Sequence, residues 1–119
     1  MNQITNNKQY NLEDRCFEFA RRVRQYVKKL PRTINNIEDG KQVIRSSGSA
    51  GANYIEANES LSKKDFIMRA KISKKETKES RYWLRLTEPL PQEQKEQIYL
   101  INECMELMKI FGAILEKCK

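Results

Sequence analysis

The stretch that decides the fold runs over residues 62–87 and reads SKKDFIMRAKISKKETKESRYWLRLT. It contains no glycine or proline, and it opens with a serine followed three residues later by an aspartate, a pattern typical of a helix N-terminus. Pro89 and Pro91 follow soon after, and proline disfavours helical geometry in the residue before it. The sequence therefore predicts one long helix over about residues 62–88.

This helix has two different faces when its residues are placed at about 100° each. On one face, seven bases fall within roughly a third of the circumference, with Tyr82 among them. We call these bases the basic stripe: Lys64, Lys71, Lys74, Lys75, Lys78, Arg81 and Arg85. The opposite face is a seam of small and apolar residues: Phe66, Ala70, Ser73, Thr77, Ser80 and Leu84. The seam is suited to packing, and the basic stripe to solvent or a charged partner.

Positive charge is concentrated in this stretch. Residues 63–85 carry nine basic residues against three acidic ones, which is six of the seven net positive charges of the chain. Regularly spaced bases fit a polyanion, because each base that neutralises a phosphate releases a condensed counterion. The alternative is a solvated helix face without a partner, although bases crowded on one arc repel one another.

Two carboxylates, Glu76 and Glu79, lie beside the seam with apolar neighbours such as Ile72 and Trp83. A buried carboxylate needs a partner. We therefore expect Glu76 and Glu79 to pair with bases of another helix or another subunit, the alternative being simple exposure at the surface.

Three more helices are predicted, over about residues 11–31, 37–60 and 92–118. The first begins with the capping pair Asn11 and Asp14 and is also rich in bases, so we expect it to share an anion-binding surface with the basic stripe. The second contains SSGSAGA at residues 46–52, which composition alone would make a flexible linker. Helical spacing of small and apolar residues continues across it, so we predict a helix with a narrow waist that neighbouring helices approach closely.

The fourth predicted helix has two apolar stripes side by side. One contains Ile98, Ile101, Met105, Met108 and Leu115, and the other contains Leu100, Cys104, Leu107, Phe111 and Ile114. A monomeric bundle needs an apolar arc of only about 100° on each helix. The excess predicts contact with another subunit, and Gly112 is a candidate for a close helix crossing.

Composition limits the classes of protein. The 119 residues suffice for one helical domain, and the few glycines and prolines argue against an all-β fold. No apolar run is long enough for a membrane span, and the start, MNQITNNKQYN, lacks the features of a signal peptide, so we expect a cytoplasmic protein. Cys16, Cys104 and Cys118 are read as core thiols. Without histidine, a phosphate loop or metal-ligand spacing, we expect no enzyme, no cofactor and no metal.

The chain resembles the four helix bundle protein family, also called the 23S rRNA intervening-sequence proteins, over nearly its whole length. The residues that carry the resemblance are Asn53, Tyr54, Glu56, Ala57, Ser62, Lys63, Phe66, Lys75, Glu76, Glu79, Ser80, Trp83 and Leu84. Many relatives have glycine where this chain has Ala57, a change that favours the helix. The resemblance implies an all-α, single-domain, antiparallel up-down four-helix bundle and structural roles for Asn53, Glu56, Glu76, Glu79 and Trp83.

The family and the similar accessory proteins of diversity-generating retroelements assemble as homopentamers, and the accessory proteins bind nucleic acid and work with a reverse transcriptase. The resemblance thus implies self-assembly, and it favours nucleic-acid binding as the role of the basic stripe. We expect a non-enzymatic RNA- or DNA-binding oligomer with little sequence specificity. The alternative is a scaffold that binds an acidic protein partner through the same stripe.

Overall fold

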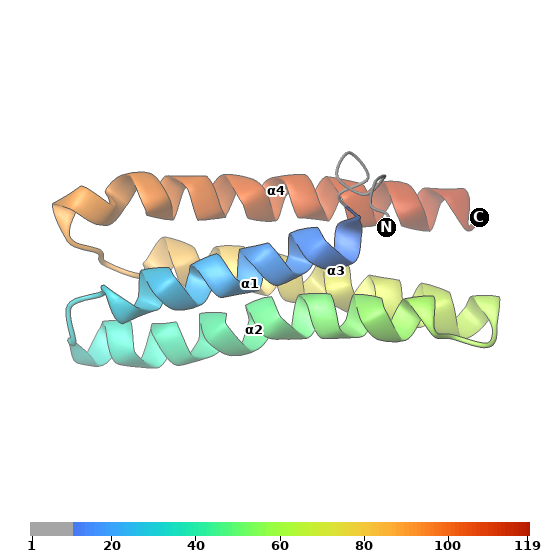
Figure 1. Ribbon diagram of the computed structural model, residues 1–119, viewed down its shortest axis with the longest axis horizontal. Helices are drawn as coiled ribbons and strands as arrows, with labels where there is room; N and C mark the ends of the chain where they lie inside the picture. Colours follow the sequence, from blue (N-terminus) through green and yellow to red (C-terminus); the bar gives the residue numbers. More distant parts are fainter. Residues whose placement is uncertain (1–10) are drawn as a thin grey trace, which may run out of the picture.

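The protein is an antiparallel bundle of four long helices, as a computed structural model describes it for residues 11–119 (Figure 1). The helices are α1 (Leu12–Lys28), α2 (Ile34–Asn58), α3 (Lys63–Leu86) and α4 (Gln94–Lys117), with a short 3₁₀ turn, η1 (Pro91–Glu93), before α4. The predicted all-α four-helix fold is confirmed. Residues 1–10, in which we looked for a signal peptide, lie outside the described part.

The four helices do not pack equally. α3 contacts α2 and α4 closely, and α1 contacts α2, whereas close backbone approaches between α1 and α4 are few. In Figure 1, α1 crosses in front of the bundle, and α3 lies behind it. One face of α3 is therefore covered by two neighbours, and its other face points outward.

The core is filled from all four helices by mostly apolar side chains. Its fully buried members include Val23, Val43, Leu84, Leu107 and Phe111. The Phe111 ring meets Tyr54 of α2 edge to face, with ring centroids 5.7 Å apart. Burying side chains of this size stabilises a fold by roughly 1.5–3 kcal/mol each before entropy is counted.

Side-chain caps set the starts of α1, α2 and α3. Asn11 and Ser62 accept hydrogen bonds from the backbone N–H groups of Asp14 and Asp65, at 2.8 and 3.1 Å, which confirms both predicted caps. α2 begins earlier than we expected, at Ile34 instead of residue 37. The reason is that Thr33 caps the helix: its hydroxyl accepts a hydrogen bond from the backbone N–H of Asn36.

Asn35 and Asn36, which precede the helix that we predicted from residue 37, lie inside α2. The buried Asn36 side chain donates to the backbone carbonyls of Pro31 and Glu88, and its oxygen accepts the N–H of Glu88 at 2.8 Å. This one side chain joins the α1–α2 and α3–α4 connections at the same end of the bundle.

The SSGSAGA segment is helical throughout, as predicted, and forms the waist of the bundle. Toward α3, the hydroxyls of Ser46 and Ser80 lie 2.7 Å apart, and Ser73 donates to the carbonyl of Ala50 at 2.8 Å. Toward α1, a Cβ added at Gly51 would lie only 3.1 Å from Cys16 Cβ. Small side chains at the waist therefore permit close packing on both sides.

Alanine substitutions at the two waist glycines should have opposite effects. A Cβ at Gly48 would meet the movable end of Arg24, so Gly48→Ala should stabilise the protein by about 0.5 kcal/mol through helix propensity. Gly51→Ala should destabilise it by about 1 kcal/mol, because α1 must shift away. Urea unfolding of both variants at one protein concentration checks the pair, and equal effects would contradict the close α1–α2 approach.

Two of the three cysteines are inaccessible. Cys16 and Cys104 are buried in the core, and burial raises the pKa of each thiol to about 12. Cys118 is only partly buried. At pH 8 a thiol reagent should therefore label one cysteine per native chain and all three after unfolding, as counted by mass spectrometry. Rapid native labelling of Cys16 or Cys104 would contradict this packing.

Candidate nucleic-acid interface

The basic stripe lies on the outward face of α3. Six of its seven members are exposed, and Arg81 is partly buried at the border with α4. No carboxylate of residues 11–119 lies within 4.0 Å of any of these seven side-chain amines or guanidinium groups. The basic stripe is thus a row of cations about 31 Å long, from Lys64 to Arg85, at 1.5 Å per residue.

Arg81 differs from the rest of the stripe. Its Nε atom is buried and has no hydrogen-bond partner in the described part of the chain. Burial raises the pKa of the Cys104 thiol on α4, and the positive charge of Arg81 opposes part of that rise. Helical projection placed Arg81 on the stripe correctly but could not show how far α4 covers it.

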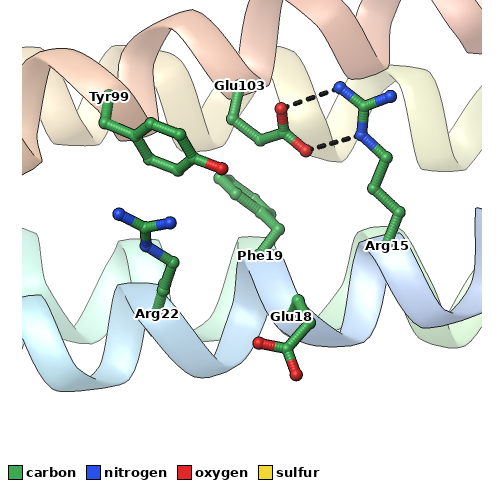
Figure 2. A pocket seen from close by; sticks show the side chains of 6 residues that line it. All are labelled: Arg15, Glu18, Phe19, Arg22, Tyr99 and Glu103. Carbon is green, nitrogen blue, oxygen red and sulfur yellow. Dashed lines mark hydrogen bonds and ion pairs between the residues drawn. The ribbon is translucent and has the colours of Figure 1, made fainter.

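The bases of α1 are arranged differently, because most of them are engaged. Arg15 makes two hydrogen bonds to Glu103 of α4, at 2.7 and 2.9 Å, and Arg22 makes two to Glu96, both at 2.8 Å. Figure 2 shows Arg15 meeting Glu103 across the groove between the helices. Lys29 adds a longer ion pair, 3.7 Å, to Glu93.

Two further α1 bases have local partners. Arg21 pairs with Glu18 on the same helix, and Arg24 donates to the carbonyls of Ala20 and Ile44. Most α1 bases therefore already have partners within the bundle, and our expectation that α1 shares the anion-binding surface stays a prediction. The seven-residue spacing of Arg15, Arg22 and Lys29 and of Glu96 and Glu103 was the sequence signal for these pairs.

These ion pairs bridge the groove between α1 and α4. The Arg22 guanidinium lies 3.7 Å from the centre of the Tyr99 ring, a cation–π contact (Figure 2). The hydrogen bonds to Arg22 lower the pKa of Glu96 below its ordinary value of 4.5. Between α1 and α4, long polar side chains therefore replace the close backbone packing seen between α1 and α2, α2 and α3, and α3 and α4.

Neutralising Arg22 should affect stability and leave anion binding unchanged. The Arg22→Gln variant should lose about 0.5–1 kcal/mol at pH 7, since water screens a partly exposed pair. Because the folded pKa of Glu96 is depressed, this contribution is present above pH 4.5 and is lost as pH falls through the folded pKa. Urea unfolding at pH 7 and pH 3.5 measures both effects, and a loss undiminished at pH 3.5 would contradict the assignment.

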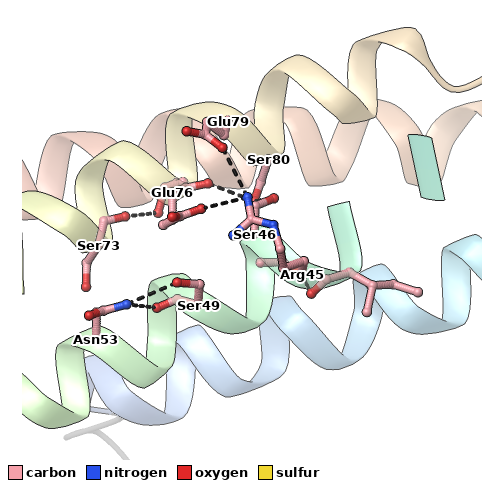
Figure 3. Close-up of polar contacts among 11 residues, drawn as sticks. Arg45, Ser46, Ser49, Asn53, Ser73, Glu76, Glu79 and Ser80 are labelled. Carbon is pink, nitrogen blue, oxygen red and sulfur yellow. Dashed lines mark hydrogen bonds and ion pairs between the residues drawn. The ribbon is translucent and has the colours of Figure 1, made fainter. Parts of the chain in front are cut away.

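Glu76 and Glu79 pair with a base of another helix, as predicted. Arg45 of α2 reaches both carboxylates, at 3.3 and 3.2 Å (Figure 3). Glu76 is 8% exposed, and Glu79 is only partly covered. The partner lies within the same chain, so these two acids need no second subunit.

The other motif residues have unequal surroundings. Asn53 donates to the Ser49 carbonyl and hydroxyl (Figure 3). Its side-chain oxygen accepts a hydrogen bond from Arg69 at 2.9 Å, so it links α2 to α3. Trp83 packs at the edge of the core. Glu56 is exposed, and its carboxylate has no ion-pair partner within residues 11–119. No side-chain contact therefore accounts for the structural role that the resemblance implies for Glu56.

On α4, only one of the two apolar stripes is buried. Leu100, Cys104, Leu107 and Phe111 fill the core. In the other stripe, Ile98 is 58% and Met105 is 37% exposed. Gly112 does not mark a close crossing, because a Cβ there would meet only the end of Lys74, at 3.6 Å.

Across the described helices, none combines the length and the apolar character that a membrane span requires.

Comparisons with known proteins agree with this architecture. A family model described as 23S rRNA-intervening sequence protein matches residues 8–113. A solved structure from Bacteroides thetaiotaomicron, described as a protein with unknown function from the S23 ribosomal protein family, is 31% identical and has a TM-score of 0.71. The similarity covers 88% of this chain and 98% of that one. A search of curated proteins found no match. The chain belongs to the family of 23S rRNA intervening-sequence proteins.

Proposed function

We propose that this protein is a non-enzymatic, homo-oligomeric nucleic-acid-binding protein that contacts phosphates through the basic stripe. The observation that carries the proposal is the contrast between two helices. Bases on α1 are mostly engaged by acids or carbonyls of the bundle, whereas those of the basic stripe have no carboxylate partner in the described chain. Bases that form no ion pair within the bundle are free to contact the phosphates of a polyanion.

The expected contacts are to the backbone of the nucleic acid, which carries no sequence information directly. Five bases at the centre and end of the stripe are the phosphate contacts we expect: Lys71, Lys74, Lys78, Arg81 and Arg85. Neutralising about five phosphates gives a slope of log affinity against log salt of roughly −3.5 for single strands and −4.5 for duplex DNA. Little sequence preference should accompany this steep salt dependence.

Binding of labelled RNA and DNA oligonucleotides, measured by anisotropy at several salt concentrations, tests the proposal. Affinity that falls steeply with salt and varies little with sequence supports it. Affinity indifferent to salt would refute it. If an acidic protein binds and mixed RNA fails to displace it, the scaffold function applies instead.

We further propose that the protein assembles as a homopentamer, as the family resemblance implies. The apolar Ile98 and Met105 on α4 support self-association, since the fold of one chain leaves them partly exposed. Light scattering should then give five times the 14.1 kDa of the chain. Assembly would place five basic stripes on one particle and strengthen weak binding by roughly 10² or more.

A further inference from the structure

We infer that the basic stripe contains a subsite for one unstacked nucleobase, formed by Tyr82 and Trp83, and that its ligand is a single-stranded nucleic acid. The inference rests on the proposed function and adds which form of nucleic acid the stripe takes. Three independent features of α3 carry it: a hollow, an exposed aromatic ring, and a compensated acid.

The hollow lies on the outward face of α3 and measures about 470 Å³. Its lining residues are Lys75, Lys78, Glu79, Tyr82 and Trp83. Steps of three and four residues bring side chains to the same helix face, one turn after another. The hollow is shallow and open, as a site for the flat face of a base needs to be.

The aromatic pair supplies that face. Tyr82 is 56% exposed, and its ring meets Trp83 edge to face, with centroids 5.0 Å apart and planes at 78°. Trp83 packs against the core and so fixes the position of its neighbour. Among residues 11–119 the Tyr82 hydroxyl has no hydrogen-bond partner, so neither core packing nor hydrogen bonding within the bundle accounts for a tyrosine here. Base–aromatic stacking is the common device of proteins that bind single strands.

The electrostatics of the hollow favour a nucleotide over a neutral aromatic ligand. Lys75 and Lys78 are exposed and have no carboxylate within 4.0 Å in the described chain. Glu79 is the one acid of the lining, and Arg45 engages it at 3.2 Å from the α2 side. The phosphates on either side of a stacked base would therefore meet two free ammonium groups.

A duplex does not fit this subsite. Its bases are paired and stacked on one another, so they present edges in the grooves and no free face to a side chain. An unpaired base has two free faces and can stack on Tyr82 while its backbone follows the lysines. The same seven cations will attract duplexes, but only a single strand gains the stacking contact.

The experiment compares three anions and three proteins. The anions are a 20-nucleotide oligo-dT, a 20-base-pair DNA duplex, and inorganic polyphosphate, which has charge but no base. The proteins are the wild type, Tyr82→Leu, which replaces the ring by a smaller apolar side chain, and Tyr82→Phe, which keeps the ring. Circular dichroism and light scattering first confirm that the variants fold and assemble equally. Trp83, the chain's one tryptophan, reports occupancy through its fluorescence.

We expect Tyr82→Leu to weaken oligo-dT binding by about fivefold to a hundredfold and to leave duplex and polyphosphate binding within about twofold of the wild type. Tyr82→Phe should match the wild type. Oligo-dT should change the Trp83 emission, and polyphosphate should not. If Tyr82→Leu binds oligo-dT like the wild type, or weakens all three anions equally, the subsite is refuted while the basic stripe stands. If none of the three anions binds the wild type, the proposed function fails as well.

Discussion

Reversing the charge of four exposed members of the basic stripe is expected to weaken nucleic-acid binding by at least about a hundredfold at moderate salt. The variant combines Lys71→Glu, Lys75→Glu, Lys78→Glu and Arg85→Glu. Each change removes a base of the stripe and adds repulsion, and each phosphate contact that is lost should also reduce the salt slope by about 0.7–0.9. Arg81 is left unchanged because its partial burial against α4 would confuse binding with folding.

The matched control reverses four exposed lysines elsewhere: Lys28, Lys41, Lys95 and Lys109. Both variants change the net charge of the chain by the same amount, so any difference between them reports position. Anisotropy titrations measure the Kd of each variant. We expect the fold-increase in Kd of the control to be less than about a tenth of the fold-increase of the stripe variant. Equal losses would mean that overall charge alone drives binding and that the basic stripe has no special role.

Removal of Arg45 should have the largest effect on stability among the polar contacts. Arg45→Met leaves Glu76, 8% exposed, without its cationic partner. Breaking a buried ion pair from one side costs about 3–5 kcal/mol, but Arg45 is half exposed and water can reach the vacated side, so we expect about 2 kcal/mol. Urea unfolding at one protein concentration measures the loss.

Two further variants distinguish the loss of the buried Arg45–Glu76 pair from the loss of an ion pair at the surface, by their effects on stability. The double variant Arg45→Met with Glu76→Gln should regain much of the stability, because no unpaired charge remains buried. Lys41→Met removes a fully solvated ion pair to Glu38 and should cost nothing measurable. A single variant Arg45→Met as stable as Lys41→Met would show that Glu76 does not depend on Arg45.

The architecture was predictable because apolar residues recur at helical spacing along the chain and because capping residues mark the starts of α1 and α3. Asn11 and Ser62 lie where the caps were expected, and five of the six seam residues of α3 are buried as projected, Phe66 being only partly buried. The helical state of the α2 waist, residues 46–52, was harder to predict, because glycine disfavours a helix locally and only packing against α1 and α3 offsets that cost. The start of α2 was misplaced because the cap formed by the Thr33 hydroxyl was not recognised in the sequence.

The candidate site was predictable only in part. Helical projection identified which bases share a face, but it could not show which bases the fold already engages. That distinction depends on the register between α1 and α4, which brings Arg15 to Glu103 and Arg22 to Glu96. The hollow beside Tyr82 likewise depends on how Trp83 packs at the core edge, which a one-dimensional pattern does not contain.

A lysine footprint tests the central claim most directly. The assembled protein, alone and saturated with a single-stranded oligonucleotide, is acetylated briefly, and the modification of each lysine is measured by mass spectrometry. We predict strong protection at Lys71, Lys74, Lys75 and Lys78 and no protection at Lys28, Lys41 and Lys109. Equal protection of all lysines, or protection confined to those outside α3, would contradict the assignment of the basic stripe as the nucleic-acid interface.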